Sequence, residues 1–411
     1  MFRSSKPLVA VGVAVLSLTA GVLRAAEEGP KVSRALEKPL KACNDAYQAK
    51  KFDEAIAKCK EAQAVPNRSA YDNFVMNQIM AVSYAQGKRY AEAYPLFKEV
   101  IDSPYVDKKA KEVFIMTEAQ IALGQKDYAG TIEWAQRAIN DGQDTAEARN
   151  MIASSYYAQN KFKECSAAAG EVVGRAEKAG QRPTENSLQM LFACQSKTSD
   201  NAGQGRTVEK LIRYYPKPDY WLNGMITLIQ SAQAAHDDRL LLQVYRLQAD
   251  VGTMKRNDQF GEMAQLSVEQ GYPGEAVVVL DQALAKGVFT DAREKAKYER
   301  LLEAAKKALA QEKEGVAKSE AEAVRTGSGD LMVAVGASYL FNIGDATKAV
   351  SLIQQGIAKG LTKIPVYDAY TTLGLAQAKA KQGAEADKSF GKVDKNDNYE
   401  RLATLWSLRV K

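Results

Sequence analysis

Apolar residues recur at spacings of three and four along nearly the whole chain, which is the periodicity of amphipathic helices. No segment alternates apolar and polar residues in the way a half-buried strand does. The helices are short and come in pairs. An aromatic residue opens the second helix of successive pairs at Phe52, Tyr90, Tyr128 and Phe162, in steps of 38, 38 and 34 residues. The pattern predicts an all-α solenoid, in which each pair buries its apolar face against its neighbours.

The second pair shows the repeating unit most clearly. On its first helix Ala81 precedes Tyr84 by three residues, and on its second helix Ala93 and Phe97 are spaced Ala-x3-Phe. Small residues are expected where two helices cross, because only they allow the backbones to approach closely. This unit resembles the tetratricopeptide-repeat (TPR) family. The resemblance covers about residues 36–411 and implies a right-handed superhelix of about nine or ten antiparallel helix pairs.

The repeat is weaker between about residues 200 and 330, but helices are still predicted there, at 221–233, 238–250, 257–270 and 275–286. The last unit returns to the template, with Ala386 and Phe390 again spaced Ala-x3-Phe. A hinge is expected at Gly327-Ser328-Gly329, after a highly charged stretch. We therefore expect four segments: a signal peptide (1–26), an N-terminal TPR array (27–200), a divergent array of helical pairs (201–326), and C-terminal TPR pairs with a capping helix (327–411).

The first 26 residues have the features of a secretory signal. Arg3 and Lys6 precede an apolar run of 16 residues, and Ala25-Ala26 precede the acidic Glu27-Glu28. The run is short for a membrane span, so a cleaved signal and a bacterial periplasmic location are expected. A retained inner-membrane anchor facing the periplasm is the alternative, because Arg24 fits poorly at a cleavage site.

Loss of this segment lowers the net charge from +6 to +3, since it carries Arg3, Lys6 and Arg24 and no acid. The remaining charge is nearly balanced. No basic stripe with interleaved aromatics is present, so nucleic acid is not an expected partner.

One segment resembles a more particular group of proteins. Tyr214-Tyr215-Pro216-Lys217-Pro218-Asp219-Tyr220-Trp221 is similar to a stretch in periplasmic TPR proteins that accompany TonB-ExbB-ExbD energy-transducing systems. This resemblance implies a bacterial envelope complex, with TonB, ExbB or ExbD components as partners.

Four cysteines in an exported chain can form two disulfides. In the repeat register Cys43 and Cys59 lie in the same helix pair, and Cys165 and Cys194 lie on consecutive helices. The pairs Cys43–Cys59 and Cys165–Cys194 are therefore predicted. The alternative is four buried thiols. A zinc site is not expected, because no CxxC unit or nearby histidine accompanies them.

The sequence offers no recognisable catalytic group. Its single histidine, His236, lies beside Asp237-Asp238 at a predicted turn, where aspartates are ordinary helix caps. The glycines near residue 203 lack the preceding strand that a phosphate-binding loop requires. A non-enzymatic protein without metal or cofactor is expected.

In the TPR family the first helix of each pair, helix A, lines a concave groove that binds partners. The residues here that match the groove positions are amides, a hydroxyl and aromatics, which suit an extended peptide backbone. They are Asn44, Tyr47, Gln78, Gln120, Asn150, Ser154 and Tyr157.

Two functional classes follow. The first is a periplasmic scaffold that binds a protein or peptide in this groove. The second is a protein that binds cell-wall glycan or exported polysaccharide, in which Tyr47, Tyr157 and Trp221 stack on sugar rings.

Overall fold

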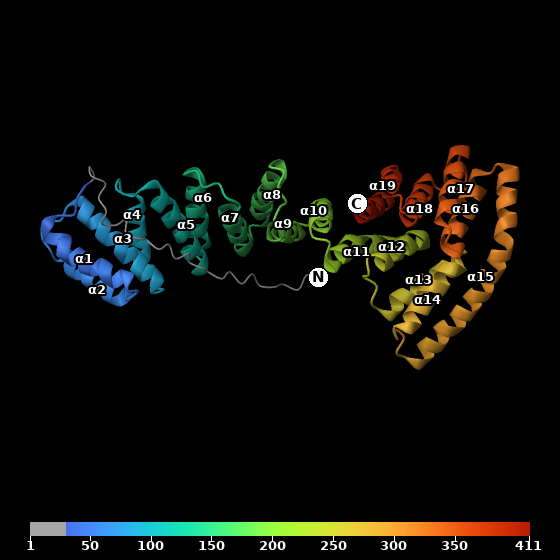
Figure 1. Ribbon diagram of the computed structural model, residues 1–411, viewed down its shortest axis with the longest axis horizontal. Coiled ribbons are helices and arrows are strands. Elements are labelled where there is room, and N and C mark those ends of the chain that lie inside the picture. Colours follow the sequence, from blue (N-terminus) through green and yellow to red (C-terminus); the bar gives the residue numbers. More distant parts are fainter. Residues whose placement is uncertain (1–29) are drawn as a thin grey trace. The chain divides into compact units, whose positions relative to one another are not determined.

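The computed structural model describes residues 30–411, and all the regular structure within them is helical (Figure 1). The predicted all-α solenoid is thereby confirmed. These residues form two compact units, 30–204 and 205–411. The expected signal peptide lies outside the described residues. Within residues 30–411, none of the helices combines the length and the apolar character that a membrane span requires.

The first unit is a succession of helical hairpins (Figure 1). Each helix packs against the next along the chain. The helices are α1 (Arg34–Gln48), α2 (Phe52–Gln63), α3 (Ala70–Gln86), α4 (Tyr90–Ile101), α5 (Lys108–Gly124), α6 (Tyr128–Asn140), α7 (Ala146–Ala158), α8 (Phe162–Lys178) and α9 (Glu185–Lys197).

The repeat residues occupy the positions predicted for them. The four periodic aromatics, Phe52, Tyr90, Tyr128 and Phe162, are the first residues of α2, α4, α6 and α8. Ala81 of α3 and Ala93 of α4 are fully buried, and Phe97 is 1% exposed. Small side chains at the crossing and an aromatic between neighbouring pairs therefore build the core of this unit.

The second unit contains the remaining helices, and α10 spans the boundary between the units. All four helices predicted in the divergent region are present, with ends within a few residues of the predicted ones. The elements are α10 (Asn201–Tyr214), α11 (Pro218–Ala235), α12 (Asp238–Asp250), α13 (Asn257–Glu269), α14 (Pro273–Ala285), α15 (Ala292–Thr326), α16 (Gly329–Ser338), the π-helix η1 (Tyr339–Ile343), α17 (Ala346–Lys359), α18 (Val366–Lys379), α19 (Gly383–Phe390) and α20 (Asp397–Val410).

The charged stretch before residue 327 forms the end of α15, a single helix of 35 residues. Gly327 ends this helix with a left-handed backbone (φ +64°), a conformation that favours glycine. Ser328 then caps α16 by accepting a hydrogen bond from the N–H of Leu331. The Gly327–Gly329 segment is thus a tight helix-to-helix turn inside the second unit, and residues 205–411 on both sides of it belong to one compact body.

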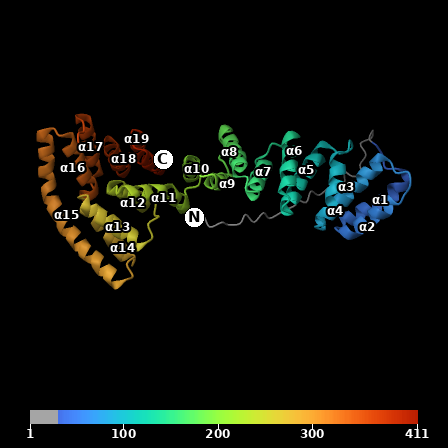
Figure 2. The ribbon, with the colours of Figure 1, turned by 180° about the vertical axis from the view of Figure 1, so that it is seen from behind.

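The second unit closes on itself at α20. This helix packs against α11 and α12 as well as against α18 and α19. Both ribbon views show α18 and α19 beside α11 and α12 (Figures 1 and 2). Leu405 of α20 lies against Gly224 of α11, where an added Cβ would come within 3.2 Å of the leucine. At the rim, Nε of Arg409 lies 2.7 Å from a carboxylate oxygen of Asp250. Helices that are distant in sequence therefore face one another across this unit.

Candidate functional sites

All four cysteines of the described chain are in disulfides, with the predicted connectivity. Cys43–Cys59 joins α1 to α2, with Cα atoms 5.2 Å apart. Cys165–Cys194 joins α8 to α9, with Cα atoms 5.9 Å apart. All four side chains are fully buried. Disulfides of this kind persist in oxidising compartments.

In three of the four cases, the first helices of successive hairpins in the first unit pack against one another. Helix α1 packs against α3, α5 against α7, and α7 against α9, whereas none of α2, α4, α6 and α8 packs comparably with another member of that set within the described residues. The first helices therefore line the more tightly packed side of the ladder. We call the outward-facing surface of α1, α3, α5, α7 and α9 the A-helix face.

Four of the predicted groove residues are half-buried on this face. Three of them make polar contacts. Gln120 donates a hydrogen bond of 3.0 Å to Glu147, Asn150 accepts one of 3.1 Å from the Ser187 hydroxyl, and the Ser154 hydroxyl donates to a backbone carbonyl one turn earlier. The fourth, Tyr157, presents its ring edge-on to Phe162 at a centroid distance of 5.5 Å. The first two bonds link neighbouring first helices and so hold the A-helix face together.

Two of the other three predicted groove residues lie deeper. Tyr47 is 9% exposed and Gln78 is 7% exposed, so both contribute to the core. Burial raises the pKa of the Tyr47 phenol. Asn44 is half-buried, and its Oδ1 has no hydrogen-bond partner among the described residues. Tyr47 and Gln78 therefore offer a partner little surface.

An aromatic cluster that the sequence reasoning missed lies at the start of α3. The ring of Tyr105, from the loop before α5, meets Tyr71 edge-on at 5.3 Å and Phe74 at 5.9 Å. Tyr105 is 36% exposed, and the two α3 rings are half-buried. The i, i+3 spacing of Tyr71 and Phe74, which places both rings on one face of a helix, is the sequence signal that could have indicated this cluster. Exposed aromatic groups of this kind are common anchors for protein partners.

The segment that resembles TonB-associated proteins is part of the fold of the second unit. Pro218 opens α11, and Tyr220 and Trp221 are 2% and 5% exposed. The Trp221 ring therefore presents no face for stacking on a sugar, and the same holds for the buried Tyr47. At the end of α11, His236 adopts a left-handed backbone, and Asp237 caps α12 by accepting from the N–H of Leu240. These two residues form the predicted turn and cap.

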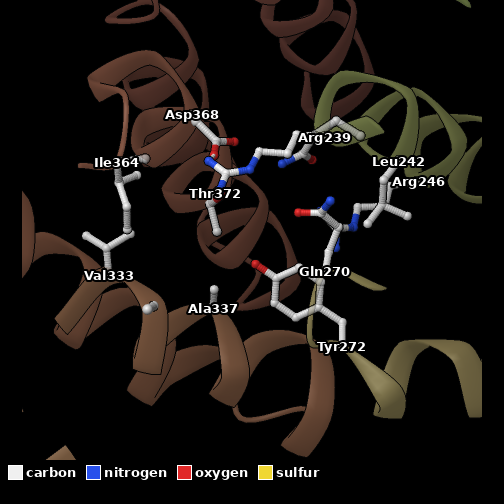
Figure 3. Close-up of a pocket in the computed structure, with 13 residues that line it drawn as sticks. Arg239, Leu242, Arg246, Gln270, Tyr272, Val333, Ala337, Ile364, Asp368 and Thr372 are labelled. Atoms are coloured by element: carbon white, nitrogen blue, oxygen red, sulfur yellow. Dashed lines mark ion pairs between the residues drawn. The ribbon is translucent and has the colours of Figure 1, made fainter. Parts of the chain in front are cut away.

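The second unit contains a pocket of about 300 Å³ that the sequence gave no reason to expect. It lies between α12, the α13–α14 turn, α16, and the start of α18 (Figure 3). Val333 and Ala337 of α16 and Ile364 before α18 supply an apolar wall. The polar lining comes from Arg239, Gln243 and Arg246 of α12, from Gln270 and Tyr272 of the α13–α14 turn, and from Asp368 of α18.

Arg246 is held rigidly at one side of this pocket. Its Nε and Nη2 atoms each lie 2.8 Å from one oxygen of Glu275. Its guanidinium also lies 3.6 Å from the ring centroid of Phe341, which belongs to the π-helix η1. Burial opposes the charge on Arg246, but Glu275 outweighs burial and raises the arginine pKa. Both members of the pair are nearly buried, with side-chain exposures of 7% and 12%. A bidentate pair in this setting fixes the side chain in one orientation.

Asp368 and Arg239 face one another without a hydrogen bond. Nη1 of Arg239 lies 4.0 Å from Oδ2 of Asp368, which is longer than an N–H···O bond. Burial raises the pKa of Asp368, although Arg239, Arg246 and a hydrogen bond from Gln243 act in the opposite direction. Gln243 is 3% exposed, and its Oε1 has no hydrogen-bond partner among the described residues.

Comparisons with known proteins give structural likeness only. No protein-family match and no match among curated proteins is found. Among solved structures, the chain is similar to one from "Structure of Naa15/Naa10 bound to HypK-THB", with 13% identity, a TM-score of 0.32, and coverage of 89% of this chain and 66% of that chain. It is also similar to yeast Tom70, with 11% identity, a TM-score of 0.24, and coverage of 91% of this chain and 95% of the Tom70 chain. A third similar structure is the P58(IPK) TPR domain, with 11% identity, a TM-score of 0.22, and coverage of 91% of this chain and 98% of that domain.

Proposed function

We propose that this chain is a non-enzymatic TPR-type scaffold that binds a protein partner along the A-helix face of its first unit. The observation that carries the proposal is the alignment of the first helices, in which α5, α7 and α9 pack side by side. Their half-buried polar residues, Gln120, Asn150, Ser154 and Tyr157, form a row that spans two helices. Amides and hydroxyls on such a face can bond an extended peptide backbone, and the tyrosine adds a flat apolar contact.

The proposed location is the bacterial periplasm. Two buried disulfides suit an oxidising compartment, and the first 26 residues have the composition of a secretory signal. The proposed partner is a component of a TonB-ExbB-ExbD envelope complex, which rests on the resemblance of residues 214–221 alone. Tyr220 and Trp221 of that segment are buried, and the proposed contact surface is the A-helix face of the first unit.

The experiment is a crosslinking pull-down of the tagged, exported chain from the periplasm, followed by mass spectrometry. Enrichment of TonB, ExbB, ExbD or another envelope protein over an untagged strain supports the proposal. A double substitution, Gln120→Ala with Tyr157→Ala, removes one amide and one ring from the A-helix face and is expected to abolish that enrichment. The matched control is Gln136→Ala on α6, an exposed residue on the opposite set of helices. Recovery of glycan fragments without any enriched protein contradicts the proposal.

A further inference from the structure

The pocket of the second unit has three features that together define the chemistry of a ligand. It contains a positive and a negative group that are close but not hydrogen-bonded to each other, Arg239 and Asp368. It contains a buried acceptor without a partner, Oε1 of Gln243. It also has an apolar wall formed by Val333, Ala337 and Ile364. Figure 3 shows Asp368 and Arg239 above this wall, with Tyr272 projecting toward the same space.

The unpaired acceptor is the most specific of these features. A buried amide oxygen without a hydrogen bond costs free energy, and nearly all such atoms in proteins find a partner. Gln243 is 97% buried and lines the cavity together with Asp368. A donor placed in the cavity would satisfy this oxygen and the Asp368 carboxylate at once. A protonated amine has three donors and a positive charge, which suits an amide oxygen beside a buried carboxylate.

The opposite end of the ligand is defined by Arg239. Its side chain is 57% exposed, whereas that of Asp368 is 17% exposed, so the arginine lies toward solvent and the acid toward the interior. A guanidinium that is not bonded to the nearby acid is available to hold a carboxylate in bidentate fashion. Arg246 differs, because Glu275 already occupies its Nε and Nη2.

We propose that this pocket binds a zwitterionic amino compound, namely a free amino acid or dipeptide with an apolar side chain. Its ammonium group lies between Asp368 and Oε1 of Gln243, its carboxylate lies on Arg239, and its side chain packs on Val333, Ala337 and Ile364. A volume of about 300 Å³ is within the range of small-molecule sites. The site is separate from the A-helix face, and it adds small-ligand binding to the scaffold role.

The test is isothermal titration calorimetry on the purified, oxidised full-length chain. L-leucine and the dipeptide Leu-Leu are the zwitterionic probes. N-acetyl-L-leucine lacks the ammonium group, and isoamylamine lacks the carboxylate. Saturable binding of at least one zwitterion, with binding of both truncated probes weaker by about tenfold or more, is the expected result. Absence of saturable binding up to millimolar concentrations of both zwitterions overturns the proposal, as does equal binding of N-acetyl-L-leucine.

Two variants assign the roles of the charged residues. Asp368→Asn keeps the shape of the side chain and removes the charge, and it is expected to weaken zwitterion binding by about tenfold or more. Arg239→Gln is expected to do the same. Because Arg239 is largely exposed, this second variant keeps the test valid if Asp368→Asn lowers the melting temperature. Arg325→Gln on α15 is the matched control, an exposed arginine outside the pocket whose loss leaves binding unchanged. Unchanged affinity in Arg239→Gln contradicts the proposed orientation. None of these measurements requires a protein partner. The proposal of zwitterion binding and the proposal of partner binding can therefore be contradicted independently.

Discussion

The guanidinium of Arg246 lies 3.6 Å from the ring centroid of Phe341, although the two residues belong to helices that are far apart in sequence. Phe341 belongs to the π-helix η1, and Arg246 belongs to α12. Asn342, the next residue, accepts a hydrogen bond from the N–H of Gly274 and donates one to the carbonyl of Gly271. The π-helix thus fixes the α13–α14 turn and supports the arginine at the same time. Single π-turns within helical structure are often found at functional sites.

Removing Glu275, the counter-ion of Arg246, is expected to destabilise the folded protein. Glu275→Ala leaves a nearly buried positive charge without its counter-ion, and a loss of about 3–5 kcal/mol in the free energy of unfolding is expected. The double variant Arg246→Met with Glu275→Leu removes both charges and is expected to lose much less. Urea denaturation of the three proteins measures the difference. If the double variant is as unstable as the single one, packing and not the unpaired charge explains the loss.

Glu118 of α5 makes the stability of the first unit depend on pH. It is fully buried, neither carboxylate oxygen has a hydrogen-bond partner among the described residues, and burial raises its pKa to about 8. The unfolded chain releases this proton near pH 4.5, whereas the folded chain retains it until about pH 8. The folded state therefore binds more protons in this window, and its stability falls as the pH rises from 4.5 to 8, by at most about 5 kcal/mol.

Comparison with the equivalent position in other repeats suggests a variant that tests this pH dependence. Glu118 precedes the small crossing residue Ala119, at the position that Met80 occupies in α3 and Ile152 in α7. Glu118→Met is expected to raise stability at pH 8 by several kcal/mol and to change it little at pH 4.5. Urea denaturation of both proteins at the two pH values provides the comparison. An equal gain at both values would show that packing, not ionisation, limits stability at this position.

The two disulfides are expected to stabilise the first unit mainly by restricting its unfolded state. They close loops with sequence separations of 16 and 29 residues. In the chain-entropy description these correspond to about 3 and about 3.5 kcal/mol. Cys43→Ala with Cys59→Ala, and separately Cys165→Ala with Cys194→Ala, are each expected to lower the unfolding free energy by amounts of this order. Dithiothreitol lowers the stability of the parent protein and, if the account is right, has no effect on a variant lacking both pairs.

Asp330 is expected to hold the loop between α17 and α18, which carries the pocket residue Ile364. Its carboxylate accepts hydrogen bonds from the backbone N–H groups of Thr362, Lys363 and Ile364 at 2.8–3.3 Å, and from the Thr362 hydroxyl at 2.6 Å. These bonds lower the pKa of Asp330 well below its usual range. The stabilisation is therefore present at neutral pH and is lost only as the pH falls well below the ordinary carboxyl value.

Hydrogen exchange measures this directly. In Asp330→Ala the amides of Thr362, Lys363 and Ile364 are expected to exchange faster, because they lose their acceptor. Asp330→Asn retains one acceptor oxygen and is expected to show an intermediate effect. Unchanged protection in Asp330→Ala would mean that packing alone holds the loop.

The helices and the disulfides could be predicted because both depend on local repetition. The 3.6-residue period located the helices, and the repeat register placed Cys43 and Cys59 in one hairpin. The depth of the groove residues was harder to predict. The same register assigns Tyr47 and Gln78 to the groove, but neighbouring side chains cover both of them. The repeat register predicts the direction in which a side chain points, but it does not predict how far neighbouring side chains cover it.

The pocket could not be predicted from the repeat. Arg239 and Asp368 come from α12 and α18, two helices that are distant in sequence and that both pack against α20. The π-helix that supports Arg246 is also absent from the repeat pattern. The pocket and the π-helix both arise from packing between helices that are distant in sequence, and the periodicity of the sequence does not predict such packing.

Site-specific photo-crosslinking in cells that export the full-length chain can show which face of the first unit contacts the protein partner. A photoreactive amino acid is placed at Gln120 on the A-helix face, or at Gln136 on α6 as the control position. If the chain binds its protein partner through the A-helix face, the Gln120 probe gives a crosslink to a defined envelope protein, and the Gln136 probe does not. Crosslinks of equal yield from both positions, or a crosslink from Gln136 alone, would contradict the account.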